Sequence, residues 1–303
     1  MGSGDGCAAA SEATREDTFL AGEGLAEAWG SYSGGLQAAR GVPATDEAHE
    51  AMASRGPDGV ERRPGGPGQA PRAPSMLCLL DALGALPELT AVSGVDEAGL
   101  PVLLPLKSRR IWNLLITGAA SSGKSEWLRA LAVSLALTSA PEKLQIAGLD
   151  LGGRELGVLE SLPHTVAELA TSLDTAHDLL VWLNSEMDRR LRGAAQKPDL
   201  ALVVDDLSWG SQAEGTSAGA LLGRLWAHGW QAGIHILAAG LGEPLVVGGT
   251  AARGRAVPGR RGWFELTTGH EYARVRACGL SAWELDHASR RLGVTSRDVG
   301  AAR

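Results

Sequence analysis

The chain has 303 residues, of which 44% are hydrophobic and 21% are charged, and its formal net charge at pH 7 is −7. This length is enough for one large domain or two small ones, and the negative net charge argues against a uniformly basic nucleic-acid-binding protein. The sequence contains no run of about 18 apolar residues, so we expect no membrane-spanning helix.

The three cysteines bear on the cellular compartment. Cys7, Cys78 and Cys278 lie far apart in the sequence and show no spacing typical of metal ligands. The first residues also lack the basic and apolar regions of a signal peptide. We therefore expect a reduced, cytoplasmic setting.

The two ends of the chain differ in charge. Residues 1–75 are rich in glycine, alanine, glutamate and proline, and carry eleven acidic residues against six arginines. Because they contain few large apolar side chains to offset the entropy of ordering, we predict a disordered segment. Residues 249–303 carry ten arginines against five acidic residues. This bias alone does not predict DNA binding.

Residues 76–109 are predicted to form a lead-in to the main domain, which we place at 110–303. A short helix over 76–89 is expected to end near Pro87, and a hairpin is expected over 90–106.

A glycine-rich loop organises the rest of the chain. It fits the pattern G-x-x-x-x-G-K-[ST] of nucleotide-binding proteins, with an apolar predicted strand over 111–117 before it and a helical pattern after it. Such a loop holds phosphates with its backbone N–H groups, while Lys124 would reach the β- and γ-phosphates of ATP and Ser125 would bind Mg²⁺. The alternative, a glycine-rich turn with a chance lysine, is disfavoured by both flanks. The predicted ATP-binding residues are Gly118, Ala119, Ala120, Ser121, Ser122, Gly123, Lys124 and Ser125.

Beyond this loop, predicted strands alternate with predicted helices. The strands cover 144–149, 200–204 and 233–239, and the helices cover 173–191 and 221–230. We expect Thr171 and Asp174 to cap the longer helix and Gly193 to end it. The alternation predicts an α/β fold, a mainly parallel sheet with helices on both faces. A hairpin over 263–277 and a helix over 281–292 are predicted to follow.

Two neighbouring carboxylates complete the predicted nucleotide site. The apolar strand over 200–204 is followed directly by Asp205 and Asp206, about 80 residues after the loop. We predict that Asp205 binds the metal through water and that Asp206 orients the attacking water. Taken alone, the pair is more typical of a solvated turn, and only its combination with Lys124 makes it a site.

Other conspicuous residues favour structural roles. We expect His164 to position a loop and His235 to be a hydrogen-bonded core residue. The side chains of Trp112, Trp182 and Trp226 are expected to face the core. Four arginines could act on the ATP of a neighbouring subunit, although a solvated basic loop is the preferred interpretation; they are Arg253, Arg255, Arg260 and Arg261.

From about residue 95 to 292 the chain resembles the motor domain of FtsK/SpoIIIE-type DNA translocases. The resemblance is carried by the segments 112–118, 150–156, 162–164, 186–190, 233–239 and 259–264, together with Trp182. It implies a RecA-like P-loop NTPase fold, a homo-oligomeric ring that is usually a hexamer, and ATP-driven movement along double-stranded DNA. The segment 150–155 resembles the related branch that powers type VII secretion almost equally well.

The chain departs from the family in three places. The family's catalytic glutamate aligns with Asp206, whose side chain is one methylene shorter. The family's polar Thr-Gln pair, which senses the γ-phosphate, aligns with Gly240 and Leu241. The region between 239 and 263 is some twenty residues shorter than in the family, and we expect it to supply a strand over 245–248.

Three functions therefore remain open from the sequence. The first is an ATPase that acts on double-stranded DNA, in which Gly240 and Leu241 could impair hydrolysis. The second is a degenerate module that holds nucleotide as a scaffold or regulatory subunit. The third is an ATPase domain of a secretion system, which would move protein.

Overall fold

The computed structural model describes residues 73–107, 111–152, 155–193, 198–207, 217–241, 251–268 and 271–293. The segment predicted to be disordered, 1–75, lies outside this part of the chain except for its last three residues, and the strand predicted over 245–248 lies outside it altogether. Among the described residues, none of the helices combines the length and apolar composition that a bilayer crossing requires.

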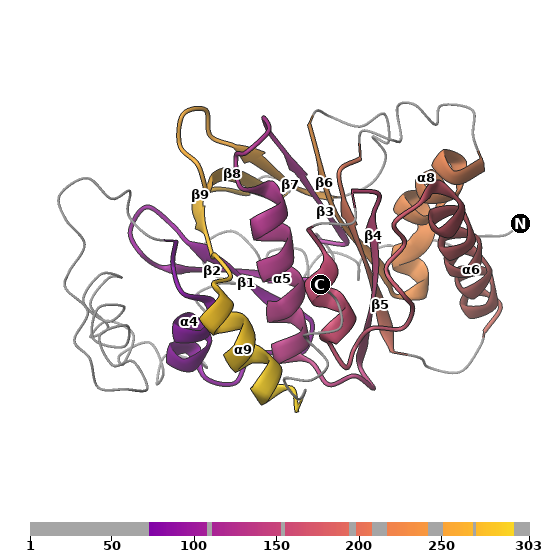
Figure 1. Cartoon of the computed structure of the whole chain (residues 1–303), viewed down its shortest axis with the longest axis horizontal. Helices are drawn as coiled ribbons and strands as arrows, with labels where there is room; N and C mark the ends of the chain where they lie inside the picture. The colour runs from indigo at the N-terminus through magenta and orange to yellow at the C-terminus, as the bar shows by residue number, and fades with distance from the viewer. Residues whose placement is uncertain are drawn as a thin grey trace, which may run out of the picture. The chain divides into compact units, whose positions relative to one another are not determined.

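Within the described residues, nine strands form one mixed sheet in the order β2-β1-β9-β8-β7-β3-β6-β5-β4 (Figure 1). Their bounds are β1 Thr90–Val95, β2 Pro101–Pro105, β3 Asn113–Thr117, β4 Leu144–Asp150, β5 Asp199–Asp205, β6 Ile234–Gly240, β7 Ala251–Ala256, β8 Trp263–Thr268 and β9 Glu271–Ala277.

The sheet has a parallel half and an antiparallel half. Strands β7, β3, β6, β5 and β4 pair in parallel, whereas β2, β1, β9 and β8 join through antiparallel pairs. The predicted α/β class is confirmed, but the sheet is parallel only around the glycine-rich loop. The sheet is less parallel than predicted because both predicted hairpins extend it, with Gly94 of β1 opposite Ala277 of β9. The lead-in therefore shares its sheet with the main domain.

Helices cover both faces of the sheet, as predicted. They are α4 Met76–Leu83, α5 Lys124–Thr138, α6 Leu173–Leu191, α8 Ser217–His228 and α9 Ala282–Arg291, with single 3-10 turns at η1 Gly157–Ser161 and η2 Gly229–Ala232. Figure 1 shows α6 and α8 side by side, away from α4, α5 and α9. Buried residues of α4, α5 and α9 belong to one apolar core, and those of α6 and α8 belong to a second.

Strand β5 shows why two cores form. Ala201 and Val203 belong to the core beneath α5, whereas Leu200, Leu202 and Val204 belong to the core beneath α6 and α8. Successive side chains of a strand point to opposite faces, so an uninterrupted apolar run is buried on both. This run carries Asp205 to the edge where the parallel strands end.

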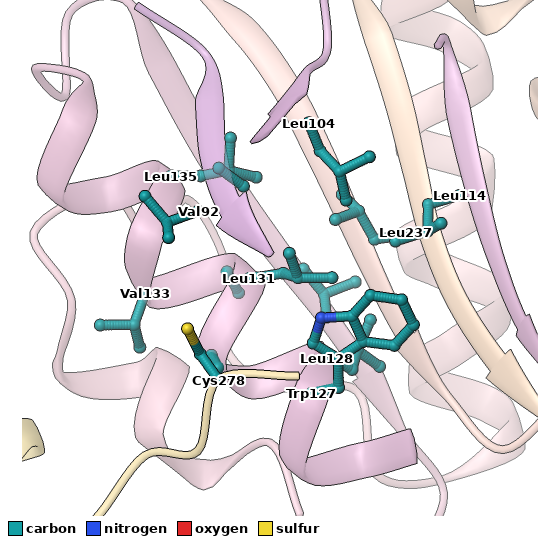
Figure 2. Close-up of a cluster of buried hydrophobic side chains, with 14 of the residues drawn as sticks. Val92, Leu104, Leu114, Trp127, Leu128, Leu131, Val133, Leu135, Leu237 and Cys278 are labelled. Atoms are coloured by element: carbon teal, nitrogen blue, oxygen red, sulfur yellow. The ribbon is translucent and has the colours of Figure 1, made fainter. Parts of the chain in front are cut away.

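The core beneath α5 is centred on Trp127, which is fully buried (Figure 2). Its ring stacks on that of Phe264, with 4.3 Å between centroids, and its Nε1 donates a hydrogen bond of 2.9 Å to the carbonyl oxygen of Ser93. Val92 and Leu104 of the β1–β2 hairpin pack in the same cluster. The first turn of α5, which follows the glycine-rich loop, is thus fixed to both hairpins.

One detail of the predicted long helix is corrected and another is confirmed. The cap of α6 is Ser172 rather than Thr171: the N–H of Thr175 donates to Ser172 Oγ, and the N–H of Ser172 donates to Thr175 Oγ1 at 3.0 Å. The helix begins one residue later than the predicted cap required. Gly193 follows the last turn with φ 88°, a left-handed conformation that suits glycine at a helix end.

The tryptophan prediction holds only in part. Trp226 is buried, whereas Trp112 is partly buried and packs on Trp230 with 4.6 Å between ring centroids. Trp182 is 40% exposed, so its core-facing prediction is wrong. The buried stripe of α6 contains Leu179 and Leu183, and Trp182 lies off that stripe.

Candidate nucleotide site

The glycine-rich loop connects β3 to α5 at the edge of the sheet where the parallel strands end. Strand β3 lies between β6 and β7, and its last residue, Thr117, pairs with Gly240 on one side and Arg255 on the other. Gly118 has φ 154° and Gly123 has φ 98°, conformations that a side chain disfavours. The loop is therefore a strand-loop-helix element of the kind that binds phosphate through backbone N–H groups.

Lys124 begins α5 and folds back over this loop. Its Nζ donates hydrogen bonds of 3.0 Å to the carbonyl oxygen of Gly118 and 2.8 Å to that of Ala119. Burial lowers the pKa of the Lys124 ammonium group, while the nearby carboxylates Asp205 and Asp206 oppose that shift. A cation is thus held at the mouth of the loop, where a phosphate would lie.

Ser125 and Asp205 meet in the structure, as the site requires. Ser125 Oγ donates a hydrogen bond of 3.0 Å to Asp205 Oδ1. Burial raises the pKa of the Asp205 carboxyl group, the hydrogen bond from Ser125 opposes the rise, and the negative charges of Asp150 and Glu155 add to it. The pair offers a hydroxyl and a carboxylate oxygen at one place.

Asp206 follows β5 with φ 56°, an uncommon conformation for a residue other than glycine. The next residue, Leu207, donates its N–H to the carbonyl oxygen of Ala239 at 2.8 Å, which fixes this turn to the end of β6. Asp206 is close enough to Lys124 to influence its pKa. The structure therefore brings both predicted carboxylates to the loop.

The predicted sensor position also lies at this edge. Gly240, the last residue of β6, is buried and pairs with Thr117, the residue before the loop. Leu241 follows and is 59% exposed. Neither residue carries a polar side chain, so the position next to the loop lacks the hydrogen-bonding groups that the family resemblance implies.

Two of the four candidate arginines are placed differently from the prediction. Arg253 and Arg255 lie in strand β7, not in a loop, because the strand pairs with both β3 and β8. Arg255 contacts Glu265 at 3.2 Å. Arg260 and Arg261 do lie in a turn, and Arg261 contacts Glu126 in the first turn of α5 at 3.5 Å. Sequence reasoning missed that this turn lies beside the loop of its own chain.

Both histidines are buried, and His235 is a hydrogen-bonded core residue, as predicted. His164 is 1% exposed, and its Nε2 donates to the carbonyl oxygen of Ser139 at 2.7 Å. His235 is 2% exposed, and its Nδ1 donates to the carbonyl oxygen of Trp112 at 3.1 Å. Burial lowers the pKa of both imidazoles.

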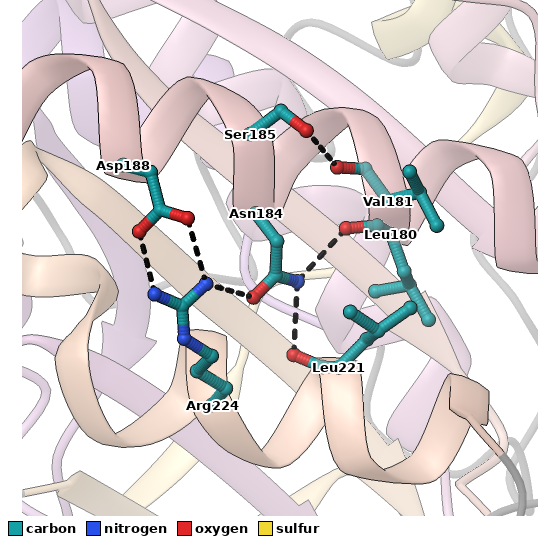
Figure 3. A network of polar contacts seen from close by, with 7 residues as sticks. All are labelled: Leu180, Val181, Asn184, Ser185, Asp188, Leu221 and Arg224. Atoms are coloured by element: carbon teal, nitrogen blue, oxygen red, sulfur yellow. Dashed lines mark hydrogen bonds and ion pairs between the residues drawn. The ribbon is translucent and has the colours of Figure 1, made fainter.

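Two of the segments that carry the family resemblance have visible structural roles. Asp150 Oδ2 accepts hydrogen bonds from the N–H groups of Glu155 at 2.7 Å and Leu156 at 3.0 Å, which shapes the turn after β4. In α6, the carboxylate of Asp188 accepts a hydrogen bond from the guanidinium group of Arg224 in α8. The side-chain amide of Asn184, also in α6, donates to the carbonyl oxygen of Leu221 at 3.1 Å (Figure 3). These contacts join α6 to α8.

The residues at the loop fit a nucleotide with Mg²⁺. This metal prefers oxygen ligands and takes one or two from the protein, with phosphates and water supplying the rest. Ser125 and Asp205 provide such a pair. Over the described ranges there is no group of three or more histidine, cysteine, aspartate or glutamate side chains that could hold a metal ion.

The comparison with protein families bears on this site directly. The model of the FtsK/SpoIIIE family matches residues 85–198, which contain the loop, the turn after β4 and the α6 segment. The resemblance to FtsK/SpoIIIE is confirmed. The matched segment ends before Asp205, so the carboxylate half of the site rests on the geometry described above.

A curated relative agrees with the family match. DNA translocase FtsK of Shewanella oneidensis is 36% identical over 104 residues, which are 34% of this chain and 11% of that protein. The chain thus spans about a tenth of the length of the curated relatives it matches.

Solved structures show the same fold at lower identity. The cytoplasmic domain of the type VII secretion ATPase EccC of Thermomonospora curvata is 22% identical, with a TM-score of 0.59 over 69% of this chain and 31% of that one. The pCW3 conjugation coupling protein TcpA, solved with ATPγS, is 18% identical, with a TM-score of 0.55 over 68% of this chain and 70% of that one. The predicted P-loop ATPase fold is thereby confirmed.

Proposed function

We propose that this chain is an FtsK/SpoIIIE-like motor domain that binds Mg-ATP at the loop 118–125 and couples its hydrolysis to double-stranded DNA. The observation that carries the proposal is the hydrogen bond of 3.0 Å between Ser125 and Asp205. This hydrogen bond joins the loop to a carboxylate eighty residues further along the chain. A glycine-rich turn that arose by chance would not be expected to have such a partner.

Each predicted residue has a role in the proposed site. The backbone N–H groups of residues 118–125 surround the phosphates, and the Lys124 ammonium group leaves its carbonyl partners for the β- and γ-phosphates. Ser125 would hold Mg²⁺ directly, and Asp205 would hold it through water. When bound, the metal would supply positive charge to the phosphate oxygens. Asp206 orients the water that attacks the γ-phosphate.

The proposal of DNA as partner rests on the relatives. The curated protein that matches at 36% identity is named a DNA translocase, whereas the likeness to the secretion ATPase EccC is below 25% identity and concerns the fold alone. By the same resemblance we propose a homo-oligomeric ring, usually a hexamer in the family. Exposed arginines, such as Arg255 and Arg261, offer positive charge for phosphate contacts.

A second function is favoured by one observation. Gly240 and Leu241 stand beside the loop without a polar side chain. A chain that keeps Lys124, Ser125 and Asp205 but lacks the sensor groups would bind ATP and hydrolyse it slowly. In that case the protein would act as a nucleotide-holding scaffold or regulatory subunit.

The ATPase rate with and without duplex DNA separates these functions. We expect slow ATP hydrolysis that rises when duplex DNA is added, stays below about 1 per second, and is absent from Lys124→Ala. DNA binding should weaken steeply as salt is raised, because phosphate contacts release counterions. If the wild-type protein bound ATP but not DNA at low salt, the scaffold function would be favoured. If it bound neither ATP nor DNA, the proposed site would be contradicted.

A further inference from the structure

The turn between β7 and β8, residues 257–262, is held in one conformation by its own hydrogen bonds. The N–H of Val257 donates to the carbonyl oxygen of Trp263 at 2.8 Å, and the N–H of Trp263 donates to that of Arg260 at 3.1 Å. Gly259 has φ 73° and Gly262 has φ 77°, so both glycines adopt the left-handed conformation that a tight turn requires.

This turn lies directly against the phosphate loop. The N–H of Gly262 donates a hydrogen bond of 3.0 Å to the carbonyl oxygen of Ser122. A Cβ atom added to Gly123 would lie 3.4 Å from the nitrogen of Gly262, and one added to Gly118 would lie 2.3 Å from Cβ of Ala256. Both glycines of the loop are therefore approached closely by the end of β7 and by the turn that follows it.

The hydrogen bond to Ser122 has a consequence for the loop. The carbonyl group of Ser122 and the N–H of Gly123 belong to the same peptide unit. In a trans peptide these two groups point in opposite directions. Because the turn holds the carbonyl group toward Gly262, the N–H of Gly123 points away from the turn, toward the other side of the loop.

Gly262 is itself held in place from two sides. Its carbonyl oxygen accepts a hydrogen bond of 2.8 Å from the N–H of Ala277, at the end of β9. The preceding residue, Arg261, contacts Glu126 of α5 at 3.5 Å. The peptide units around Gly262 are therefore tied to both the sheet and the helix that follows the loop.

From these contacts we propose that the turn 257–262 positions the phosphate loop, with Gly262 as the positioning residue that aims the N–H of Gly123 at a nucleotide phosphate. The inference rests on the proposed ATP site and adds a part to it that lies about 140 residues further along the chain. Since the turn acts on a backbone N–H of the loop, it governs affinity for the phosphate chain of the nucleotide.

The test compares two glycines of the same turn by calorimetry with Mg-tripolyphosphate, which carries the phosphate chain without the nucleoside. Gly259 and Gly262 have nearly equal φ values, and an added Cβ has no heavy atom within 4 Å at either. An alanine at either position therefore strains the backbone alike and should lower the thermal unfolding midpoint alike. Only Gly262 contacts the loop.

We expect Gly262→Ala to weaken tripolyphosphate binding by about tenfold, the fold-change that corresponds to left-handed strain transmitted to the loop, and Gly259→Ala to change it by less than about twofold. Gly262→Asn should fall between wild type and Gly262→Ala, since asparagine tolerates this conformation better. The asparagine variant keeps the comparison available if the alanine variant does not fold.

Equal losses in the Gly259 and Gly262 variants, or no loss in either, would overturn the positioning role while leaving the ATP site intact. If the wild-type protein bound neither ATP nor tripolyphosphate, the proposed function would fail, and this inference would fail with it. These two results are distinguished by the wild-type measurement.

Discussion

Ser125 Oγ and Asp205 Oδ1 lie 3.0 Å apart, although eighty positions separate the two residues in the sequence. The contact exists because α5 begins at the end of β3 while Asp205 ends β5, and β6 lies between these two parallel strands. Parallel strands end at one edge of the sheet, which places a hydroxyl group beside a carboxylate. The nucleotide site is therefore a property of the sheet as much as of the loop.

The first prediction concerns Lys124. We expect Lys124→Ala to weaken Mg-ATP binding by about 10- to 100-fold, the range for loss of hydrogen bonds to a charged group. Lys143→Ala is the matched control, because Lys143 precedes β4, its side chain is 58% exposed, and its ammonium group contacts Glu88 at 3.8 Å rather than the loop. Calorimetry measures both. Equal affinities for wild type and Lys124→Ala would contradict the phosphate-loop assignment.

The second prediction concerns Asp205. Burial raises the pKa of its carboxyl group, so the ionised form costs folding free energy at every pH above the unfolded value. Asp205→Asn removes this charge and keeps an oxygen that can accept from Ser125. We expect the variant to unfold at a higher temperature than wild type at pH 7 and to need more Mg²⁺ for ATP binding. A lower unfolding temperature together with an unchanged Mg²⁺ requirement would rule out this account.

The third prediction concerns pH. Burial lowers the pKa of His235 below its usual value of 6.5, against the opposing effects of Asp199 and the carbonyl group of Trp112, and the charge of Lys107 adds to the lowering. His235 is therefore protonated near pH 6.5 in the unfolded chain, but only at a lower pH in the folded chain. The folded state should lose stability as pH falls from about 7 to 5, by at most about 1.4 kcal/mol per pH unit for each such histidine.

Variants at the two buried histidines provide the check, since burial also lowers the pKa of His164. The slope of unfolding free energy against pH should be smaller in His235→Asn and in His164→Gln than in wild type. A wild-type stability that does not change between pH 7 and 5 would show that neither histidine is buried in the neutral form.

The fourth prediction concerns the core. Trp127 is fully buried, stacks on Phe264 and donates to Ser93, so Trp127→Ala should lower the unfolding free energy by about 3 to 5 kcal/mol. Trp182→Ala, at a residue 40% exposed, should lower it by less than about 1 kcal/mol. Denaturant unfolding measures both values. Similar losses would mean that the two tryptophans share the same environment.

The elements of the parallel half could be predicted from sequence because each has a local signal. The apolar run before Asp205 can be buried only as a strand covered on both faces, and the stripe of α6 repeats at helical spacing. The exposure of Trp182 could not be predicted, because it depends on which neighbour covers the helix. Likewise, nothing in the local pattern indicates that β1 pairs with β9, since that pairing joins segments about 180 residues apart.

The candidate site likewise contains residues that could be predicted from the sequence and residues that could not. The loop 118–125 carries its own pattern, and Asp205 follows a strand that the sequence reveals. The contact of Gly262 with Ser122 has no such signal, because a glycine in a turn is common and its partner is set by the sheet order β8-β7-β3. Arg253 and Arg255 were misplaced for a related reason: a short alternation of arginine and small residues predicts a strand only once its neighbours are known.

ATP hydrolysis depends on protein groups that contact the γ-phosphate and the attacking water in the transition state. The reaction needs a metal, a positioned water and donors for the charge on the phosphoryl oxygens. In the proposed site, Lys124 would clamp the phosphates, and Ser125 and Asp205 would be the metal ligands. Asp206 is one methylene shorter than the family's glutamate, and a displacement of about 1 Å can lower a rate on the order of 100-fold.

The last prediction follows for turnover. Gly240 pairs with Thr117 beside the loop and Leu241 is 59% exposed, so neither position donates a side-chain hydrogen bond to the γ-phosphate. We expect tight ATP binding with a turnover below the range of about 1 to 1,000 per second that is typical of enzymes. Gly240→Thr with Leu241→Gln, alone or with Asp206→Glu, should raise the steady-state rate, whereas Leu241→Ala should not. Brisk DNA-stimulated hydrolysis by the wild-type protein would refute this and would mean that another residue, such as one from a neighbouring subunit, takes the place of the sensor.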